Sequence, residues 1–304
     1  MLLSINLLIY WALVILNVGR AKEEKEKMKN IFYTLIITLL ISLVPLSKAS
    51  ALRFATFNIQ NLGVTKMSRQ EDMERIVDII RSYDVIAIQE ISDSHQTVGN
   101  RLIDMVNRSN TNRSYHYSIS LSPRTGQQDN DASKAEQYAF VYNDRLLEVI
   151  ESHLYDDSMH DYFGREPWIA RFRLRNTSTT FALVNIHTVP TEALEEINAL
   201  DYVVQSIQRT EPNVIVLGDM NAACEYAHPQ EVHSTRLFDE SRYTSIIPDS
   251  ADTNLARSQC AFDRVILTNP MRRYIPRTRN NWGVVTDVPR TVSDHYPVWF
   301  NLNL

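Results

Sequence analysis

The chain has 304 residues, of which 44% are hydrophobic and 22% are charged, and its formal net charge is −5. This is ordinary globular composition, and it excludes a repeat protein because no internal repeat, charge block or Pro-, Ser- or Gly-rich tract occurs after residue 52.

The N-terminal region differs from the rest of the chain. Residues 1–18 are mostly apolar, 19–30 are charged and 31–46 are apolar again. The second apolar block has the form of a secretory signal, with Met28 and Lys29 before it and the small residues 49–51 after it. We therefore expect residues 1–27 to be an upstream extension outside the fold and 28–51 to be a signal peptide, cleaved near Ala51. The alternative is a membrane anchor, but both blocks are shorter than the ~20 residues that span a bilayer.

Residues 52–304 are expected to form one secreted domain of about 250 residues, because no linker divides them. Without residues 1–51 the chain has 25 basic and 33 acidic residues, a net charge of −8, so a polyanion would need local basic patches or divalent cations. Two cysteines in an exported chain, Cys224 and Cys260, suggest one disulfide, with two unrelated free thiols as the alternative.

In chain order, the first half of this domain begins with a strand at residues 52–57. Ser68 and Glu71 have the spacing of a capping box, which predicts a helix whose apolar positions fall on one face. A strand at 85–88, a helix around 98–106 and strands at 115–121 and 138–142 follow.

The second half continues with strands at 146–155, 169–174 and 181–186, a helix over 192–207, and strands at 214–217, 262–267 and 298–302. These strands are too many for one simple βαβ sheet. Two packed sheets flanked by helices are therefore predicted.

Polar side chains recur where the apolar runs begin or end. A single buried carboxylate could be a satisfied structural group, but six polar tips are explained more economically by one shared site that includes a cation. The tips are Phe57-Asn58, Ile88-Gln89-Glu90, Asn185-Ile186-His187, Gly218-Asp219-Met220-Asn221, Phe262-Asp263 and Ser293-Asp294-His295.

The atom types at these tips indicate the chemistry. Carboxylates and amides are hard oxygen ligands that suit Mg²⁺, Mn²⁺ or Ca²⁺, whereas zinc would more usually recruit thiolates or an HExxH motif, which is absent. No GxGxxG, P-loop or GxSxG motif occurs, so neither a nucleotide cofactor nor a serine hydrolase is predicted. Two histidines with carboxylates and a divalent ion suit hydrolysis of a phosphate ester.

These motifs carry a family resemblance. The sequence resembles the endonuclease/exonuclease/phosphatase superfamily in "FNIQNLG" (57–63), "IQE" (88–90), "NIHTVP" (185–190), "GDMNA" (218–222), "FDRVIL" (262–267) and "SDHYPV" (293–298). Within it, the deoxyribonuclease I family is singled out by "TKMS" (65–68), "DSH" (93–95), "YHY" (115–117), "REP" (165–167), "EIN" (196–198) and "IPDSADT" (247–253).

The resemblance implies a four-layer α/β/β/α sandwich with two packed, mostly antiparallel sheets. It also implies a secreted endonuclease that hydrolyses DNA, with double-stranded DNA as the expected form, to 5′-phosphate products with Mg²⁺ (or Mn²⁺) and Ca²⁺. His187 and His295 would be the acid and base pair, oriented by Glu136 and Asp263. The metal and scissile phosphate would be surrounded by Asn58, Glu90, Asp219, Asn221 and Asp294.

Further residues are implied less directly. Asp252 and Ser258 in one loop, and Asp157, Asp161 and Glu166 in another, are expected calcium ligands, with a solvated acidic loop as the alternative for each. Arg165 falls on a DNA-phosphate position, although it could instead form a salt bridge with its surroundings. A groove-inserting tyrosine of the family is replaced by Lys134, and the loop 122–135 also offers Arg124, so we expect DNA to be gripped mainly through its phosphates.

Two other functions stay open at this point. A different phosphodiesterase of the superfamily, such as a sphingomyelinase or an abasic-site endonuclease, would share the general motifs but not "REP", "SADT" and the cysteine pair. A non-catalytic binding module would not need both histidines. A monomer without stable membrane association is expected, and actin binding is not predicted.

Overall fold

The structure is a computed structural model that describes residues 25–30, 33–34, 51–108, 115–126, 134–278 and 280–304. The described residues from 51 onward belong to one compact unit. Most of the expected signal peptide, residues 28–51, lies outside the described residues and stays a prediction. Within the described ranges, no helix has the length and apolar character needed to cross a membrane.

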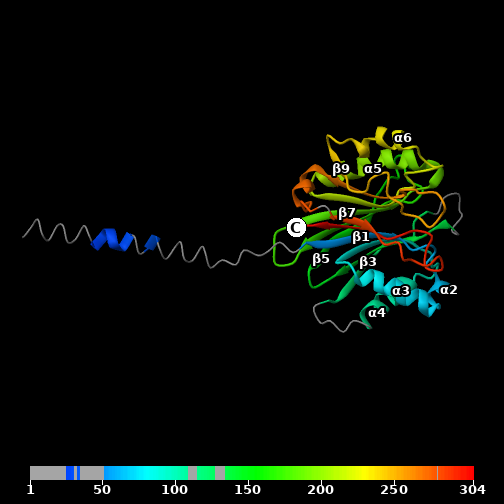
Figure 1. The fold of residues 1–304 in the computed structure, drawn as a ribbon, viewed down its shortest axis with the longest axis horizontal. Helices are drawn as coiled ribbons and strands as arrows, with labels where there is room; N and C mark the ends of the chain where they lie inside the picture. Colours follow the sequence, from blue (N-terminus) through cyan, green and yellow to red (C-terminus); the bar gives the residue numbers. More distant parts are fainter. Residues whose placement is uncertain (1–24, 31–32, 35–50, 109–114, 127–133, 279) are drawn as a thin grey trace, which may run out of the picture. The chain divides into compact units, whose positions relative to one another are not determined.

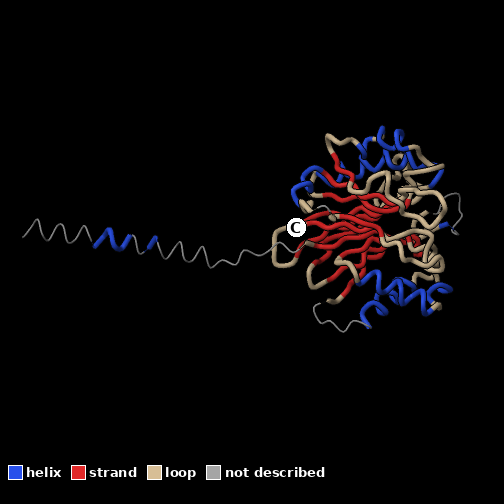
Figure 2. Tube along the Cα trace, in the orientation of Figure 1, coloured by secondary structure: helices blue, strands red, loops and turns tan. Residues whose placement is uncertain are grey.

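Two six-stranded sheets form the centre of this unit (Figure 2). The first has the order β11 (Trp282–Val284), β12 (Val298–Leu302), β1 (Leu52–Asn58), β2 (Val85–Ile91), β4 (Gln137–Asn143) and β3 (Tyr117–Leu121). The second has the order β5 (Leu147–Leu154), β6 (Trp168–Leu174), β7 (Thr180–His187), β8 (Val214–Asp219), β10 (Asp263–Thr268) and β9 (Tyr243–Ser245). The pairs β1–β2 and β7–β8 are parallel, and the other described pairs are antiparallel.

Helices cover the outer face of each sheet (Figure 1). The first sheet is covered by α2 (Val64–Met67), α3 (Gln70–Arg81) and α4 (Val98–Arg108), and the second by α5 (Ala193–Gln208) and α6 (Pro229–Ser234). Short 3₁₀ helices lie at η3 (Pro190–Glu192), η4 (Arg236–Phe238) and η5 (Asn269–Tyr274). These four layers confirm the predicted fold class.

Three apolar layers hold the sandwich together. The layer between the sheets includes Phe54 of β1, whose ring stacks on Phe300 at 5.1 Å between centroids and meets Phe181 of the second sheet edge-on at 5.7 Å. The next residue, Ala55, faces the layer under α3 and α4, as the two-residue period of a strand requires. Both faces of the central strands are buried, which explains their nearly continuous apolar runs.

Some local expectations were wrong. Ser68 does not begin the helix α3: it is the C-terminal cap of α2, its Oγ donates to the Thr65 carbonyl at 2.7 Å, and Arg69 precedes α3 without a side-chain cap. The short elements α2, α6, β9 and β11 carry too little periodicity to be predicted. Strand β8 runs on to Asp219, two residues beyond the apolar run.

Candidate active site

Sheet topology brings the polar strand tips to one edge of the molecule. Strands β1 and β2 run parallel, as do β7 and β8, so their carboxyl ends emerge together. Strands β12 and β10 are antiparallel neighbours of β1 and β8, so their first residues lie at the same edge. Residue pairing places His187 and Asp263 on either side of Asp219 in the second sheet.

The first histidine forms a pair with a buried carboxylate. Nδ1 of His187 lies 3.1 Å from both carboxylate oxygens of Glu136. Burial opposes the charge on His187, but the charge and hydrogen bond of Glu136, together with the charge of Asp219, raise the pKa of the imidazole above its usual value. In return, the imidazole lowers the pKa of Glu136 against the effect of its own burial.

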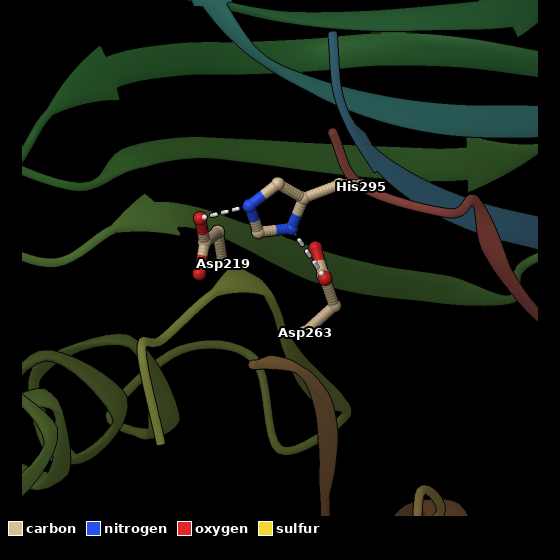
Figure 3. A group of neighbouring side chains, drawn as sticks. All are labelled: Asp219, Asp263 and His295. Atoms are coloured by element: carbon tan, nitrogen blue, oxygen red, sulfur yellow. Dashed lines mark hydrogen bonds and ion pairs between the residues drawn. The ribbon is translucent and has the colours of Figure 1, made fainter. Parts of the chain in front are cut away.

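The second histidine repeats this arrangement. Nδ1 of His295 lies 2.9 Å from Oδ2 of Asp263, and Nε2 lies 3.4 Å from Oδ2 of Asp219, so the ring stands between two carboxylates (Figure 3). Burial opposes protonation, but Asp219 and then Asp263 raise the pKa of His295 to about 10. Burial raises the pKa of Asp263, whereas in Asp219 the burial effect is outweighed by His295 and His187, which lower its pKa.

Both imidazoles point at the same oxygen. Nε2 of His187 lies 3.6 Å from Oδ2 of Asp219, on which His295 also converges. Because each ring uses Nδ1 to contact its own carboxylate, each keeps Nε2 for proton transfer toward the shared centre. The arrangement can donate a proton from one side and accept one from the other.

Four of the five expected metal ligands lie close together, and the fifth, Asp294, lies at the exposed side of the site. Nδ2 of Asn58 donates to Oε1 of Glu90 at 2.8 Å and to Oδ2 of Asp219 at 3.0 Å, which joins the two sheets. Asn221 follows the last residue of β8, Asp219, by two positions, and its backbone N–H donates to Oδ1 of Asp219 at 3.1 Å. Asp294 is exposed and acts on the site electrostatically, as one of the carboxylates that raise the pKa of His295.

Unusual backbone geometry shapes this edge. Glu90 has φ +63° at an irregularity in the pairing of β2 with β4, and Asn221 has φ +46°. Non-glycine residues with positive φ are uncommon and concentrate at functional sites. Gly218 of β8 has φ +143°, and a Cβ there would overlap the carbonyl oxygen of Ile186 in the neighbouring strand β7, so only glycine fits at this position directly before Asp219.

The residues fit a divalent cation. Among the described residues, Asp219, Asp263 and His295 form a group whose possible ligand atoms all lie within 4.8 Å of one another. One Asn58 amide donates to carboxylate oxygens of both Glu90 and Asp219, so these two oxygens lie close together. Closely spaced carboxylate oxygens suit Mg²⁺ or Mn²⁺.

The disulfide between Cys224 and Cys260 confirms the expected pairing, with Cα atoms 5.8 Å apart. Cys224 follows Asn221 by three residues, and Cys260 precedes Asp263 by three residues. The bond therefore ties together the two loops that flank β8 and β10 at the site.

The three predicted DNA-contact residues differ in their exposure to solvent. Lys134 is exposed, and Arg124 is half-buried beside the loop that carries Thr125. The side chain of Arg165 is only 12% exposed: its Nε donates to the His187 carbonyl at 3.0 Å and its Nη2 to the Thr188 carbonyl at 3.0 Å. Most of the guanidinium is thus engaged with the protein, and a DNA contact by Arg165 stays a prediction.

Two acidic loops contain the expected calcium ligands. Asp157, Asp161 and Glu166 line a cavity of about 940 Å³, where burial first, and then the charges of Glu166 and Asp161, raise the pKa of Asp157. In the other loop, Nδ2 of Asn254 donates to Oδ1 of Asp252 at 3.3 Å and to the Ser258 carbonyl at 3.1 Å. In the described residues, Asp157, Asp161 and Glu166 do not bring three ligand atoms as close together as the active-site group does.

Two further side chains, Lys66 and Ser293, support the site. The buried ammonium of Lys66 donates to the carbonyls of Ile59 and Val292, each at 2.9 Å, and Oγ of Ser293 donates to the Asn58 carbonyl at 2.7 Å. These contacts hold the segment after β1 against the segment that carries His295. The sequence placed Lys66 in the motif "TKMS" and Ser293 in the motif "SDHYPV", but neither motif indicated what these side chains contact.

Comparisons with known proteins show which family this chain resembles. The model of the Endonuclease/Exonuclease/phosphatase family matches residues 55–295. Deoxyribonuclease-1 of Homo sapiens is 35% identical over 268 residues, 83% of this chain and 93% of that protein. Deoxyribonuclease-1 of Bos taurus is 33% identical over 281 residues, 87% of this chain and 97% of that protein.

Solved structures agree at the level of the fold. A humanized TDP2 of D. rerio has a TM-score of 0.57 at 15% identity and covers 84% of this chain and 99% of its own. The human Nocturnin catalytic domain has a TM-score of 0.55 at 13% identity and covers 84% of this chain and 94% of its own. From the family match and the length and identity of the alignments, the chain belongs to the endonuclease/exonuclease/phosphatase family and, within it, to the deoxyribonuclease-1 group.

Proposed function

We propose that this protein is a secreted, divalent-metal-dependent endonuclease that hydrolyses DNA phosphodiester bonds and leaves 5′-phosphate ends. The observation that carries the proposal is the pair of histidine–carboxylate contacts that converge on one oxygen of Asp219. Membership of the deoxyribonuclease-1 group supports DNA as the substrate. The disulfide supports export to an oxidising compartment.

In the proposed mechanism the two histidines carry protons on opposite sides of the reacting phosphate. One imidazole accepts a proton from the attacking water at Nε2, and the other donates a proton from Nε2 to the leaving oxygen. Glu136 and Asp263 hold the rings through Nδ1 and stabilise their protonated forms. Such carboxylate partners fix both the tautomer and the orientation of an imidazole.

Asn58, Glu90, Asp219 and Asn221, with Asp294 at the exposed side, would hold the divalent cation. When bound, the cation would supply positive charge to the phosphate oxygens. The protein's own contribution is to keep these oxygens together, through Asn58 between Glu90 and Asp219.

A plasmid-nicking assay with Mg²⁺ and Ca²⁺ tests the function. Each of His187→Ala and His295→Ala is expected to lower kcat by about 10²-fold or more, the usual contribution of a general acid or base. His116→Ala is the matched control, because His116 also pairs with a carboxylate, Asp144 at 2.7 Å, but is exposed and outside the site. Wild-type cleavage that survives EDTA, or activity retained in both active-site variants, would contradict the mechanism.

The acidic loops are the proposed calcium sites. Bringing Asp157 near Glu166 and Asp161 is unfavourable without a cation, because all three groups are acidic. Calcium is therefore expected to raise the melting temperature, and Asp157→Asn should reduce that increase. An equal response of wild type and variant to calcium would remove this loop from the proposal.

A further inference from the structure

Helix α5 carries a buried carboxylate that the mechanism above does not use. Glu196 is 0% exposed, and its two oxygens accept hydrogen bonds from two backbone amides: Gly164 N–H at 2.8 Å and Val189 N–H at 3.2 Å. Burying an ionisable group is costly unless it makes specific contacts, so a fully buried glutamate calls for a physical explanation. The two amides belong to segments that lie 25 residues apart in the sequence.

One of these segments contacts the backbone of His187, and the other contains His187. Gly164 directly precedes Arg165, whose guanidinium donates to the carbonyls of His187 and Thr188. Val189 follows His187 by two residues. Glu196 therefore connects the Gly164–Arg165 turn to the end of β7 and the residues that follow it. Arg165 contacts the same part of the backbone.

The Thr188 carbonyl connects this arrangement to the other side of the site. It accepts from Nη2 of Arg165 at 3.0 Å and from Nδ2 of Asn221 at 3.0 Å. A displacement of the Gly164–Arg165 turn would therefore be transmitted both to the backbone of His187 and to the loop of Asn221.

We propose that Glu196 is a positioning residue for catalysis: its ionised carboxylate clamps the Gly164–Arg165 turn to the His187–Val189 segment and so sets the position of the His187 imidazole. The inference rests on the proposed nuclease function for its kinetic consequence. The clamp itself can be measured without substrate.

The charge of Glu196 makes the clamp sensitive to pH. The charged and titratable groups that act on it are Arg165, Glu192 and Tyr138. Burial raises the pKa of Glu196 to about 7, against the two backbone hydrogen bonds and Arg165, which lower it. The ionised form accepts more strongly from both amides than the neutral acid does, so the clamp tightens as the pH rises through about 7.

The test compares Glu196→Gln with Asp201→Asn. The amide side chain keeps the size of glutamate but turns an NH₂ group toward one of the two backbone N–H groups. Asp201 is the control because it is also a buried carboxylate of α5, yet it contacts Tyr243 at 2.6 Å and Arg242 at 2.8 Å, away from the site. Plasmid cleavage, amide hydrogen exchange and urea unfolding are measured for each variant from pH 5.5 to 8.5.

Glu196→Gln is expected to lower kcat about tenfold at pH 8, a typical effect of a residue that supports a catalytic ligand, and to lower it less at pH 5.5. Amide exchange at Gly164 and Val189 should accelerate in this variant alone. Asp201→Asn should leave kcat within about twofold of wild type.

Stability provides an independent readout with the opposite sign. Because folding raises the pKa of Glu196, the unfolded chain releases this proton first, and the wild type loses stability as the pH rises from about 4.5 to about 7. The glutamine variant has no such loss of stability. As the pH rises, its urea midpoint should therefore increase relative to that of the wild type. Over the same pH range, its kcat should decrease relative to that of the wild type. A group with a merely structural role would not produce these opposite trends.

Unchanged amide exchange at Gly164 and Val189 in Glu196→Gln would overturn the clamp. Accelerated exchange with wild-type kcat at pH 8 would overturn the positioning role. A wild-type protein that does not cleave DNA would overturn the proposed function, and the exchange and unfolding measurements would still decide whether Glu196 clamps the two segments.

Discussion

Removal of the disulfide should cost this protein much of its stability. Cys224 and Cys260 are separated by 36 residues, and the chain-entropy relation for a closed loop of that length gives about 4 kcal/mol at 25 °C. A domain of this kind has a total free energy of unfolding of about 5–15 kcal/mol, so the loss is a large part of the whole. The perturbation is the double substitution Cys224→Ser/Cys260→Ser, which avoids leaving one free thiol.

The assay is equilibrium unfolding in urea, followed by plasmid nicking of the folded variant. We expect the free energy of unfolding to fall by about 4 kcal/mol. We also expect a lower kcat, because the loops of Asn221 and Asp263 lose their covalent connection. A loss below about 1 kcal/mol, or an unchanged kcat, would refute the view that the bond supports the site as well as the fold.

Three other predictions address the site and its surroundings. Glu136→Gln should lower the pKa of His187, because Glu136 is the main group that raises it, and should reduce kcat by about 10–100-fold; an NMR titration and a pH–rate profile measure both. Asp93→Ala should cost about 1 kcal/mol near pH 7, because Asp93 accepts from the N–H groups of Thr97 and Val98 at the start of α4. The hydrogen bonds of Asp93 outweigh its burial and lower its pKa to about 2, so this cost should disappear as the pH falls from about 4 toward 2 in urea unfolding at several pH values. DNA cleavage should weaken steeply between low and physiological salt if phosphate contacts by Lys134 and Arg124 dominate binding, whereas salt-insensitive cleavage would count against them.

The sequence predicted the layers of the fold because their cause is local. Apolar runs such as residues 214–217 and the spacing of apolar residues in 192–207 reflect one strand and one helix, and both elements occur close to their expected bounds. The residue types that gather at the site were also predictable, since the carboxylates, amides and histidines stand at the ends of apolar runs in the sequence. The capping box at Ser68 failed because a preceding turn of helix, α2, uses that residue as its own end.

Only the tertiary structure decided which of these groups meet. The hydrogen bond from Asn58 to Asp219 joins residues 161 positions apart, and it depends on the packing of two sheets that no local pattern specifies. The same holds for the hydrogen bond from Arg165 to the His187 carbonyl, which its motif did not indicate, and for the burial of Glu196, which its position in the helix did not indicate. By itself the sequence therefore determined the elements and the residue types at their ends, because these depend on neighbouring residues. Strand pairing and sheet packing determined the partners, because those contacts form only when distant segments fold together.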